Sequence, residues 1–461
     1  MADGQKSKVG EFLNQAELLL PGRCSAAEAI RLHHANSLTF IKSQPPDAVV
    51  WPETTAEVSA LVKLAAGLRI PLIAFGAGTS LEGHVNAPRG GVAVDFSKMN
   101  RVLEVRPDDL DCTVEAGITL QRLRQDLRDT GLFFPVDPGA DHATLGGMAA
   151  TRASGTTTLR YGSMRDNVVN LTAVMASGEI VRTARRTRKS SAGYDLTRLL
   201  IGSEGTLGLM TELTLKLYGV PETILAASAA FETIEGACRA STTAIQAGLN
   251  LARIELLDAV QMQCVNAHSH LNLDVLPTLF LEFQGSSVAC GADFAMFAEI
   301  AAVEGVRRIA SAADDPGRKR LWQARHDAFW SVKNAWPGRD VVVTDVAVPL
   351  SRLAEAVTET AADIQSSRLN APIVGHVGDG NFHAIVVFDL ADTSELARVE
   401  AFLERLAARA LALDGTVTGE HGIGQGKRRF MAGEHGAALD VMRAIKYALD
   451  PLEIFNPDKI F

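Results

Sequence analysis

Residues 71–83 read PLIAFGAGTSLEG, an apolar run that passes directly into a loop of glycines and small polar residues. The run from Pro71 to Phe75 is typical of a buried β-strand. Upstream, Ala48 to Trp51 predicts another short strand, and Thr54 with Glu57 forms a capping-box sequence for a helix between the two strands. The sequence therefore predicts a strand–helix–strand unit that ends in a glycine-rich loop.

Such a loop can bind an anion, because successive backbone N–H groups approach a phosphate without a Cβ in the way. The spacing of Gly76, Gly78 and Gly83 matches neither the Rossmann nor the Walker A fingerprint, and a tight structural turn is an equal alternative for this loop alone. Two further stretches of small residues, 146–155 and 202–208, favour one extended ligand such as a dinucleotide over three unrelated turns. Glycine, alanine, serine and threonine dominate residues 135–166 and leave few side chains to fill a core, which predicts a functional loop.

The remaining pattern predicts two lobes. In the first lobe we expect strands at 92–96, 101–105 and 111–116, a helix at 119–131 and a hairpin at 171–183. After Pro221, helices are expected at 233–248, 289–303, 318–335, 351–367 and 393–413, and strands at 252–257, 278–283, 341–348, 372–377 and 382–388. This alternation predicts an antiparallel sheet covered by helices, followed by a turn-rich tail that packs back onto the first lobe.

Composition narrows the class of protein. A chain of 461 residues with 47% hydrophobic and 21% charged residues is globular and too long for one core. The net charge of −9 argues against a nucleic-acid partner, and no apolar stretch is long enough to cross a bilayer. Met1 to Gln15 resembles neither a secretory signal nor a transit peptide. The five scattered cysteines exclude an iron–sulfur cluster or a cysteine-based zinc site. We interpret them as reduced thiols, and we therefore expect a cytoplasmic protein, free or peripheral to a membrane.

A candidate metal site lies in residues 373–383, which read IVGHVGDGNFH. If Asp379 and Gly380 form a two-residue hairpin turn, His376 pairs with His383 and both imidazoles point to one face. Catalytic zinc sites often add a carboxylate and leave one position open. Glu420 is the candidate for this third ligand, and the adjacent His421 for an acid–base group.

Two alternatives remain for this segment. Asp379 is a rival ligand, although an Asp in a turn more often caps backbone N–H groups. The hairpin could also hold two core histidines next to an unrelated Glu-His loop.

Seven strings occur in a fixed order along the chain. They are FGAGTSLEG (75–83), RASGTTTLRYGSMRDNV (152–168), SSAGYDLTRLLIGSEGTLG (190–208), LWQARHDAFW (321–330), GHVGDGNFH (375–383), GEHGIGQGK (419–427) and the terminal NPDKIF. Together they resemble the D-lactate dehydrogenase (cytochrome) family, within the FAD-linked oxidoreductases that include glycolate oxidase catalytic subunits and D-2-hydroxyglutarate dehydrogenases. The resemblance runs from about residue 45 to the C-terminus.

The resemblance implies an α+β protein with a p-cresol-methylhydroxylase-type FAD-binding domain at 1–220, its core at about 45–220. A ferredoxin-like substrate (cap) domain would occupy 221–414, and 415–461 would return to the FAD domain. It also implies that FAD binds non-covalently, because Thr79 stands where flavin-linking relatives place a histidine. The residues implied to bind FAD are Gly76, Ala77, Gly78, Thr79, Ser80, Pro138, Gly139, Gly146, Gly147, Ala150, Ser154, Gly155, Glu204, Gly205 and Asn456.

The implied reaction is oxidation of a small D-2-hydroxy acid by hydride transfer to flavin. A divalent metal, zinc by preference or manganese, would sit on His376, His383 and Glu420 and acidify the substrate hydroxyl. His421 would accept the hydroxyl proton, and Arg325 would grip the carboxylate, although a solvated helix residue is the alternative for Arg325.

The implied substrate and partners are less specific. Relatives that handle dicarboxylates carry a lysine within the segment that here reads Val343-Thr344-Asp345, so D-lactate is favoured over D-2-hydroxyglutarate. D-2-hydroxyglutarate or glycolate dehydrogenase and an oxygen-using flavin oxidase remain alternatives. The electron acceptor would be a cytochrome, an electron-transfer flavoprotein or a quinone, and a homodimer stays open. The basic run 182–189 is either a solvated loop or a dock for an acidic electron carrier.

Overall fold

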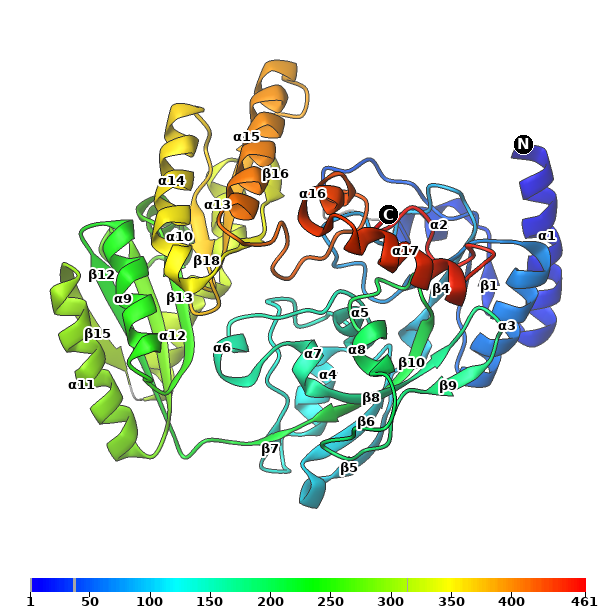
Figure 1. Cartoon of the computed structure of the whole chain (residues 1–461), viewed down its shortest axis with the longest axis horizontal. Helices are drawn as coiled ribbons and strands as arrows, with labels where there is room; N and C mark the ends of the chain where they lie inside the picture. Colours follow the sequence, from blue (N-terminus) through cyan, green and yellow to red (C-terminus); the bar gives the residue numbers. More distant parts are fainter. Residues whose placement is uncertain (1, 36–38, 313) are drawn as a thin grey trace. The chain divides into compact units, whose positions relative to one another are not determined.

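The strand–helix–strand unit predicted at residues 48–75 is present in the computed structural model, which describes residues 2–35, 39–312 and 314–461 (Figure 1). Strand β2 (Ala48–Val50) leads into helix α3 (Thr55–Leu68) and strand β3 (Leu72–Phe75). The capping box is confirmed, because the Thr54 hydroxyl accepts the Glu57 N–H and the Glu57 carboxylate accepts the Thr54 N–H. Strand β4 (Val92–Asp95) lies between β2 and β3, parallel to both.

The chain forms two compact units, here called unit 1 and unit 2. Unit 1 comprises Met1–Ser154, Gly162–Val220 and Glu420–Phe461, and unit 2 comprises Gly155–Tyr161 and Pro221–Gly419. The sequence did not predict that the short segment 155–161 belongs to unit 2. Its helix α6 (Thr158–Tyr161) contacts strand β13 (Leu251–Leu257) of unit 2.

Unit 1 contains two main sheets. The first has the order β1-β2-β4-β3, with β1 (Cys24–Ser25) antiparallel at one edge. It packs on α3 and on the N-terminal helix α1 (Ala2–Leu19), which contributes the buried Phe12. The second sheet is antiparallel in the order β5-β6-β10-β8-β9. Its strands are β5 (Val102–Arg106), β6 (Asp111–Glu115), β8 (Val168–Val174), β9 (Ile180–Arg182) and β10 (Leu209–Lys216).

The strands and the hairpin predicted for this second sheet are confirmed, since β8 and β9 pair antiparallel. The predicted helix at 119–131 is shorter in the structure, because α4 spans Leu120–Asp126 and Leu127 is its C-cap. The smaller elements of unit 1 are α2 (Glu28–His33), α8 (Leu196–Leu200) and a two-stranded pair of β7 (Leu132–Phe133) with β11 (Tyr218–Gly219).

The small-residue segment 135–166, expected to be one loop, contains three short helices. They are α5 (Leu145–Ala150), α6 and α7 (Met164–Asn167). Thr144 and Ser163 cap the first and the last of them with their hydroxyl groups. Capping hydroxyls therefore start helices in a segment whose small residues gave no periodic apolar signal.

The C-terminal tail belongs to unit 1 and includes α16 (Met431–His435) and α17 (Ala438–Leu449), drawn in red in Figure 1. Residues 454–456 run parallel to β3, where the Leu72 N–H donates to Ile454 O (2.7 Å) and the Asn456 N–H donates to Leu72 O (2.9 Å). The buried Lys446 ammonium donates to Phe455 O (3.0 Å) and Thr206 O (2.8 Å). These bonds fix the position of Asn456.

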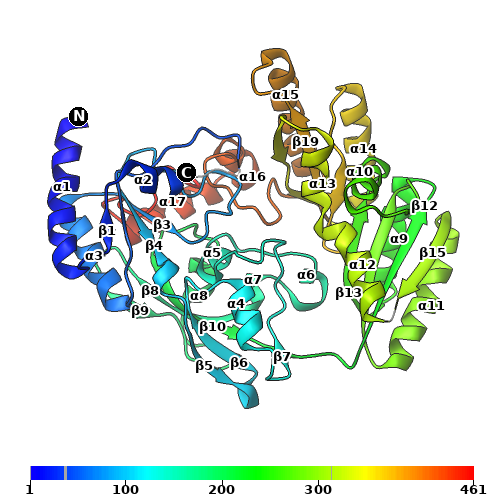
Figure 2. The ribbon, with the colours of Figure 1, turned by 180° about the vertical axis from the view of Figure 1, so that it is seen from behind.

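Unit 2 is an antiparallel sheet covered by helices, as predicted, and the helices lie on both of its faces (Figures 1 and 2). The main strand order is β15-β12-β14-β13-β18-β19-β16, and β17 pairs with β19. The strands besides β13 are β12 (Thr223–Phe231), β14 (Thr278–Gly285), β15 (Val306–Ala312), β16 (Asp340–Val343), β17 (Val346–Ala347), β18 (Ile373–Gly375) and β19 (Asn381–Phe388). The helices are α9 (Ile234–Gln246), α10 (Ala259–Ser269), α11 (Ser287–Val303), α12 (Asp315–His326), α13 (Ala328–Ala335), α14 (Leu353–Ser366) and α15 (Thr393–Ala412).

Two predicted elements of unit 2 are each divided in the structure. The helix expected at 318–335 is two helices, α12 and α13, which meet at Asp327. The strand expected at 341–348 is broken at Thr344 and Asp345 into β16 and β17. At this break the Ala384 N–H donates to the Thr344 hydroxyl (2.7 Å), a side-chain bond that takes the place of a backbone one.

Among the residues that the structure describes there is neither a helix that could span a membrane nor a disulfide bond. Across 2–35, 39–312 and 314–461, no helix combines the length and the hydropathy of a bilayer span. All five cysteines are free thiols.

Replacing Phe455 by alanine should destabilise unit 1. The ring is fully buried in the core beside β3, and such truncations cost about 3–5 kcal/mol. Urea unfolding followed by circular dichroism measures the loss. Val441→Ala, at a side chain 62% exposed on α17, is the control and should change stability by less than about 0.5 kcal/mol. Equal effects of the two substitutions would contradict the tail's role in the core.

Candidate functional site

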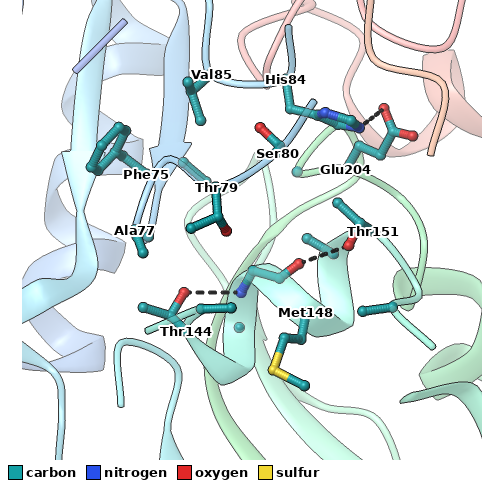
Figure 3. Close-up of a pocket in the computed structure, with 18 of the residues that line it drawn as sticks. Phe75, Ala77, Thr79, Ser80, His84, Val85, Thr144, Met148, Thr151 and Glu204 are labelled. Carbon is teal, nitrogen blue, oxygen red and sulfur yellow. Dashed lines mark hydrogen bonds and ion pairs between the residues drawn. The ribbon is translucent and has the colours of Figure 1, made fainter. Parts of the chain in front are cut away.

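A cavity in unit 1 is walled by all three glycine-rich stretches (Figure 3). Twelve of the residues predicted to bind the cofactor line it: Gly76, Ala77, Gly78, Thr79, Ser80, Pro138, Gly146, Gly147, Ala150, Glu204, Gly205 and Asn456. Gly139, Ser154 and Gly155 are outside this lining, and Gly155 belongs to unit 2. The structure thus brings together segments that are far apart in the sequence, since Gly76 and Asn456 are 380 residues apart.

Two glycines of the cavity wall are held too tightly for a side chain. A Cβ on Gly76 would lie 2.2 Å from the Thr144 hydroxyl, and one on Gly146 would lie 2.7 Å from the Ala116 side chain. The Thr144 hydroxyl also accepts the Gly147 N–H (3.3 Å), a bond drawn in Figure 3. The first glycine loop and the start of α5 are therefore in direct contact.

The buried carboxylate of Glu204 holds the loop 419–427 in the cavity wall. It accepts the N–H groups of Ile423 (2.6 Å) and Gly424 (2.8 Å), and His84 Nε2 lies 3.3 Å away (Figure 3). Burial opposes ionisation, but His84 and the two N–H groups outweigh it and hold the pKa of Glu204 below its ordinary value. The Glu204 side chain therefore faces this loop, and its clamp positions Glu420 and His421.

Glu420 and His421 both line the unit 1 cavity. The Ser154 hydroxyl donates to Glu420 Oε2 (2.9 Å), and His421 Nε2 lies 3.8 Å from Glu420 Oε1. Ser154 is not part of the lining itself, but it contacts Glu420, which is. His84 was not predicted as a site residue, since its only signal in the sequence is its place directly after Gly83 at the end of the first glycine loop.

The cavity residues fit FAD. Small side chains and backbone line most of the wall, which suits a long flat ligand. Two buried polar atoms of lining residues, Asn456 Oδ1 and His84 Nδ1, have no hydrogen-bond partner within the described part of the chain. The Asn456 amide N–H₂ is already used by His84 O (3.2 Å) and Glu204 O (2.7 Å). A polar ligand would satisfy the two remaining atoms.

In unit 2, the predicted pairing of His376 with His383 is wrong by two residues. Val374 is the residue opposite His383, and β18 ends at Gly375. The turn is not a two-residue one, because His376 O accepts the N–H groups of Asp379 (2.9 Å) and Asn381 (3.3 Å) and closes a longer loop. A shift of two residues keeps the same face of the sheet, so the two imidazoles still meet, with ring centroids 5.5 Å apart and planes at 85°.

The Nδ1 atoms of both histidines have fixed partners in unit 2. His376 Nδ1 lies 2.7 Å from Glu255 Oε1, and His383 Nδ1 lies 2.8 Å from Thr344 O. An imidazole that donates from Nδ1 carries its lone pair on Nε2, the usual atom for a metal. The broken strand at Thr344 is thus what orients His383. Asp345 Oδ1 is 3.8 Å from His383 Nδ1, whereas Asp379, the rival ligand, is exposed.

Arg325 is not a solvated helix residue. Its Nε donates to Glu255 Oε2 (2.6 Å), and its side chain is only 17% exposed. Burial opposes the charge on Glu255, but His376 and Arg325 hold its pKa below the ordinary value. The remaining predicted ligand, Glu420, belongs to unit 1, so the three-ligand metal site stays a prediction.

The chain matches two known families along most of its length. Residues 46–184 match the FAD binding domain, and residues 220–460 match the C-terminal domain of FAD linked oxidases. The fold is that of p-cresol methylhydroxylase, whose structure with bound substrate superposes with a TM-score of 0.80 at 16% identity, over 98% of this chain and 97% of that one.

Two relatives are similar in sequence as well. A probable mitochondrial D-lactate dehydrogenase of Danio rerio is 49% identical, over 95% of this chain and 88% of its own length. The mitochondrial D-lactate dehydrogenase (cytochrome) of Arabidopsis thaliana is 41% identical, over 90% of this chain and 73% of its own length. Both are named mitochondrial, so the prediction of a cytoplasmic location is wrong. The negative net charge and the free cysteines do not distinguish the cytoplasm from the mitochondrion, so they could not predict the location.

The matched families, the fold and these identities agree with the FAD-fitting cavity of unit 1. The chain therefore belongs to the D-lactate dehydrogenase (cytochrome) family of FAD-dependent oxidoreductases.

Proposed function

We propose that the chain oxidises D-lactate to pyruvate, using FAD bound in the unit 1 cavity and a divalent metal bound at His376 and His383. The observation that carries the proposal is the orientation of the two imidazoles, whose Nδ1 atoms are both engaged by acceptors of unit 2. Such engagement is how proteins prepare histidines for a metal. The names of the two relatives support the choice of D-lactate.

The cofactors supply the chemistry that side chains lack. FAD accepts two electrons as hydride from the substrate carbon. A divalent metal lowers the pKa of a hydroxyl that it binds, and imidazole ligands suit zinc, with manganese as the alternative. Glu420 remains the proposed third ligand.

The protein residues bind the substrate and move its proton. Arg325 uses Nε for Glu255, which leaves the two terminal nitrogens of its guanidinium for a forked contact with the substrate carboxylate. His421 lines the FAD cavity and is proposed to accept the hydroxyl proton, because imidazole exchanges protons near neutral pH.

A monocarboxylate suits the surroundings of the two histidines. The segment Val343-Thr344-Asp345 carries no cation for a second carboxylate, and its polar groups are committed within unit 2. Thr344 binds His383 and Ala384, and Asp345 accepts from Asn381 (2.8 Å) and Thr418 (2.7 Å). For the electron acceptor we propose a cytochrome, after the name of the Arabidopsis relative. An electron-transfer flavoprotein or a quinone is the alternative.

Substrate choice is tested by steady-state rates with an artificial dye as electron acceptor. D-lactate should show a kcat/KM at least tenfold above that of D-2-hydroxyglutarate, because the segment Val343-Thr344-Asp345 carries no cation for a second carboxylate. Its kcat/KM should also exceed that of glycolate, in line with the names of the two relatives. Faster turnover of the dicarboxylate would sink the proposal. Substrate-dependent peroxide in air without dye would instead identify an oxidase.

Metal dependence is tested by chelation. Removing divalent ions should lower kcat with D-lactate at least tenfold while the flavin content stays unchanged, since none of the residues predicted to bind FAD is a proposed metal ligand. Adding back zinc or manganese should restore the rate. Full activity in the metal-free protein, checked by elemental analysis, would contradict the metal role.

FAD binding at the first glycine loop is tested by Gly76→Ala. The added Cβ would meet the Thr144 hydroxyl at 2.2 Å and displace the cavity wall, so the purified variant should carry much less flavin per protein than the parent. Gly67→Ala in α3 is the matched control, because no atom beyond its chain neighbours and the nearby backbone of the helix lies within 4 Å of its Cβ. Thermal melts show whether the variant is folded, and a folded Gly76→Ala with full flavin content would refute the assignment.

A further inference from the structure

We propose that Glu255 is a positioning residue for the reaction, whose single carboxylate orients both the metal-binding His376 and the substrate-binding Arg325. The inference rests on the proposed function, and it names the residue that sets the spacing between the two groups that hold the substrate. Glu255 lies on β13, in the middle of the unit 2 sheet.

Each oxygen of this carboxylate has its own partner. Oε1 lies 2.7 Å from His376 Nδ1, and Oε2 lies 2.6 Å from Arg325 Nε. His376 follows β18, which neighbours β13, and Arg325 comes from α12. Glu255 therefore links the loop that carries His376 to the helix that carries Arg325.

A carboxylate at this position is costly for the fold. The Glu255 side chain is fully buried, and its neighbours on the strand, Ile254 and Leu256, are buried apolar residues. A buried ion pair is weak support for stability, because an apolar side chain of similar volume often serves as well or better. The charge is therefore better explained by what it does to His376 and Arg325 than by stability.

The contacts have direct chemical consequences. Accepting the Nδ1 proton of His376 leaves the lone pair on Nε2 and raises its basicity as a ligand. Accepting the Nε proton of Arg325 fixes the plane of the guanidinium and leaves the pair of terminal nitrogens at its end for the substrate carboxylate. His383 is different, because a backbone carbonyl, Thr344 O, orients it.

The geometry of the substrate explains why the two groups are coupled. In a 2-hydroxy acid the hydroxyl and the carboxylate are on adjacent carbons, so the groups that bind them must keep a fixed separation. A single rigid carboxylate that contacts both groups keeps this separation. Small errors in such positioning are costly for the rate.

The test uses the flavin-loaded full chain and two substitutions of Glu255. Glu255→Gln keeps the shape but offers one acceptor oxygen, so it can serve either His376 or Arg325 and presents an N–H₂ group to the other. Glu255→Asp keeps the charge but is too short to hold both. The matched control is Glu282→Gln on neighbouring β14, another buried carboxylate, whose contacts are Gln284 (2.6 Å) and Arg253 (3.8 Å).

Two readouts separate positioning from folding. Affinity for Zn²⁺ and Mn²⁺, measured by competition with a chelating dye, should fall about 10–100-fold in Glu255→Gln, the range typical of lost partners of metal ligands. The KM for D-lactate should rise and kcat should fall, while flavin content stays that of the parent. Glu282→Gln should keep the parent's metal affinity and KM within twofold.

The outcomes distinguish this inference from the proposed function. If the parent protein binds no divalent metal and is indifferent to chelation, the proposed function fails. If the parent needs metal but Glu255→Gln keeps the parent's metal affinity and KM, the role of Glu255 is overturned. If Glu255→Gln does not fold, the same two measurements on Glu255→Asp decide, and parental values there overturn the inference as well.

Discussion

The buried carboxylate of Glu204 is the interaction on which the cofactor cavity depends. It lies in the third glycine-rich stretch, yet it binds the backbone of Ile423 and Gly424, more than 200 residues later. Through this clamp the chain's last segment becomes part of the cavity wall, together with His421. Because the carboxylate is removed from water, its charge must be met by fixed donors, and these donors are what define the path of the loop.

Unit 2 has a similar buried carboxylate, that of Glu255, which accepts hydrogen bonds from distant segments. There a buried carboxylate on a central strand binds an imidazole and a guanidinium from two other elements. The neighbouring break between β16 and β17 supplies a backbone carbonyl to the second imidazole. Both units thus orient functional side chains with buried acceptors, because a buried acceptor fixes direction more strictly than packing alone can.

Local signals predicted most of the elements. Capping residues, β-branched runs and glycine loops act over a few residues, so β2, α3, β3 and the β8–β9 hairpin could be read directly from the sequence. The sequence did not predict that the helix expected at 318–335 and the strand expected at 341–348 are each divided in two. Each break depends on partners far along the chain, such as the bond from Ala384 N–H to the Thr344 hydroxyl.

The sequence by itself determined the glycine-rich stretches, the two histidines and the Glu-His loop, because residue type alone decides which side chains can bind a phosphate or a metal. Only the tertiary structure decided the register at His376, the engagement of Arg325 and the roles of His84, Glu204 and Glu255. These depend on hydrogen bonds between residues that are distant in sequence. Such bonds form only when packing brings their atoms within about 3 Å, a condition that no local pattern encodes.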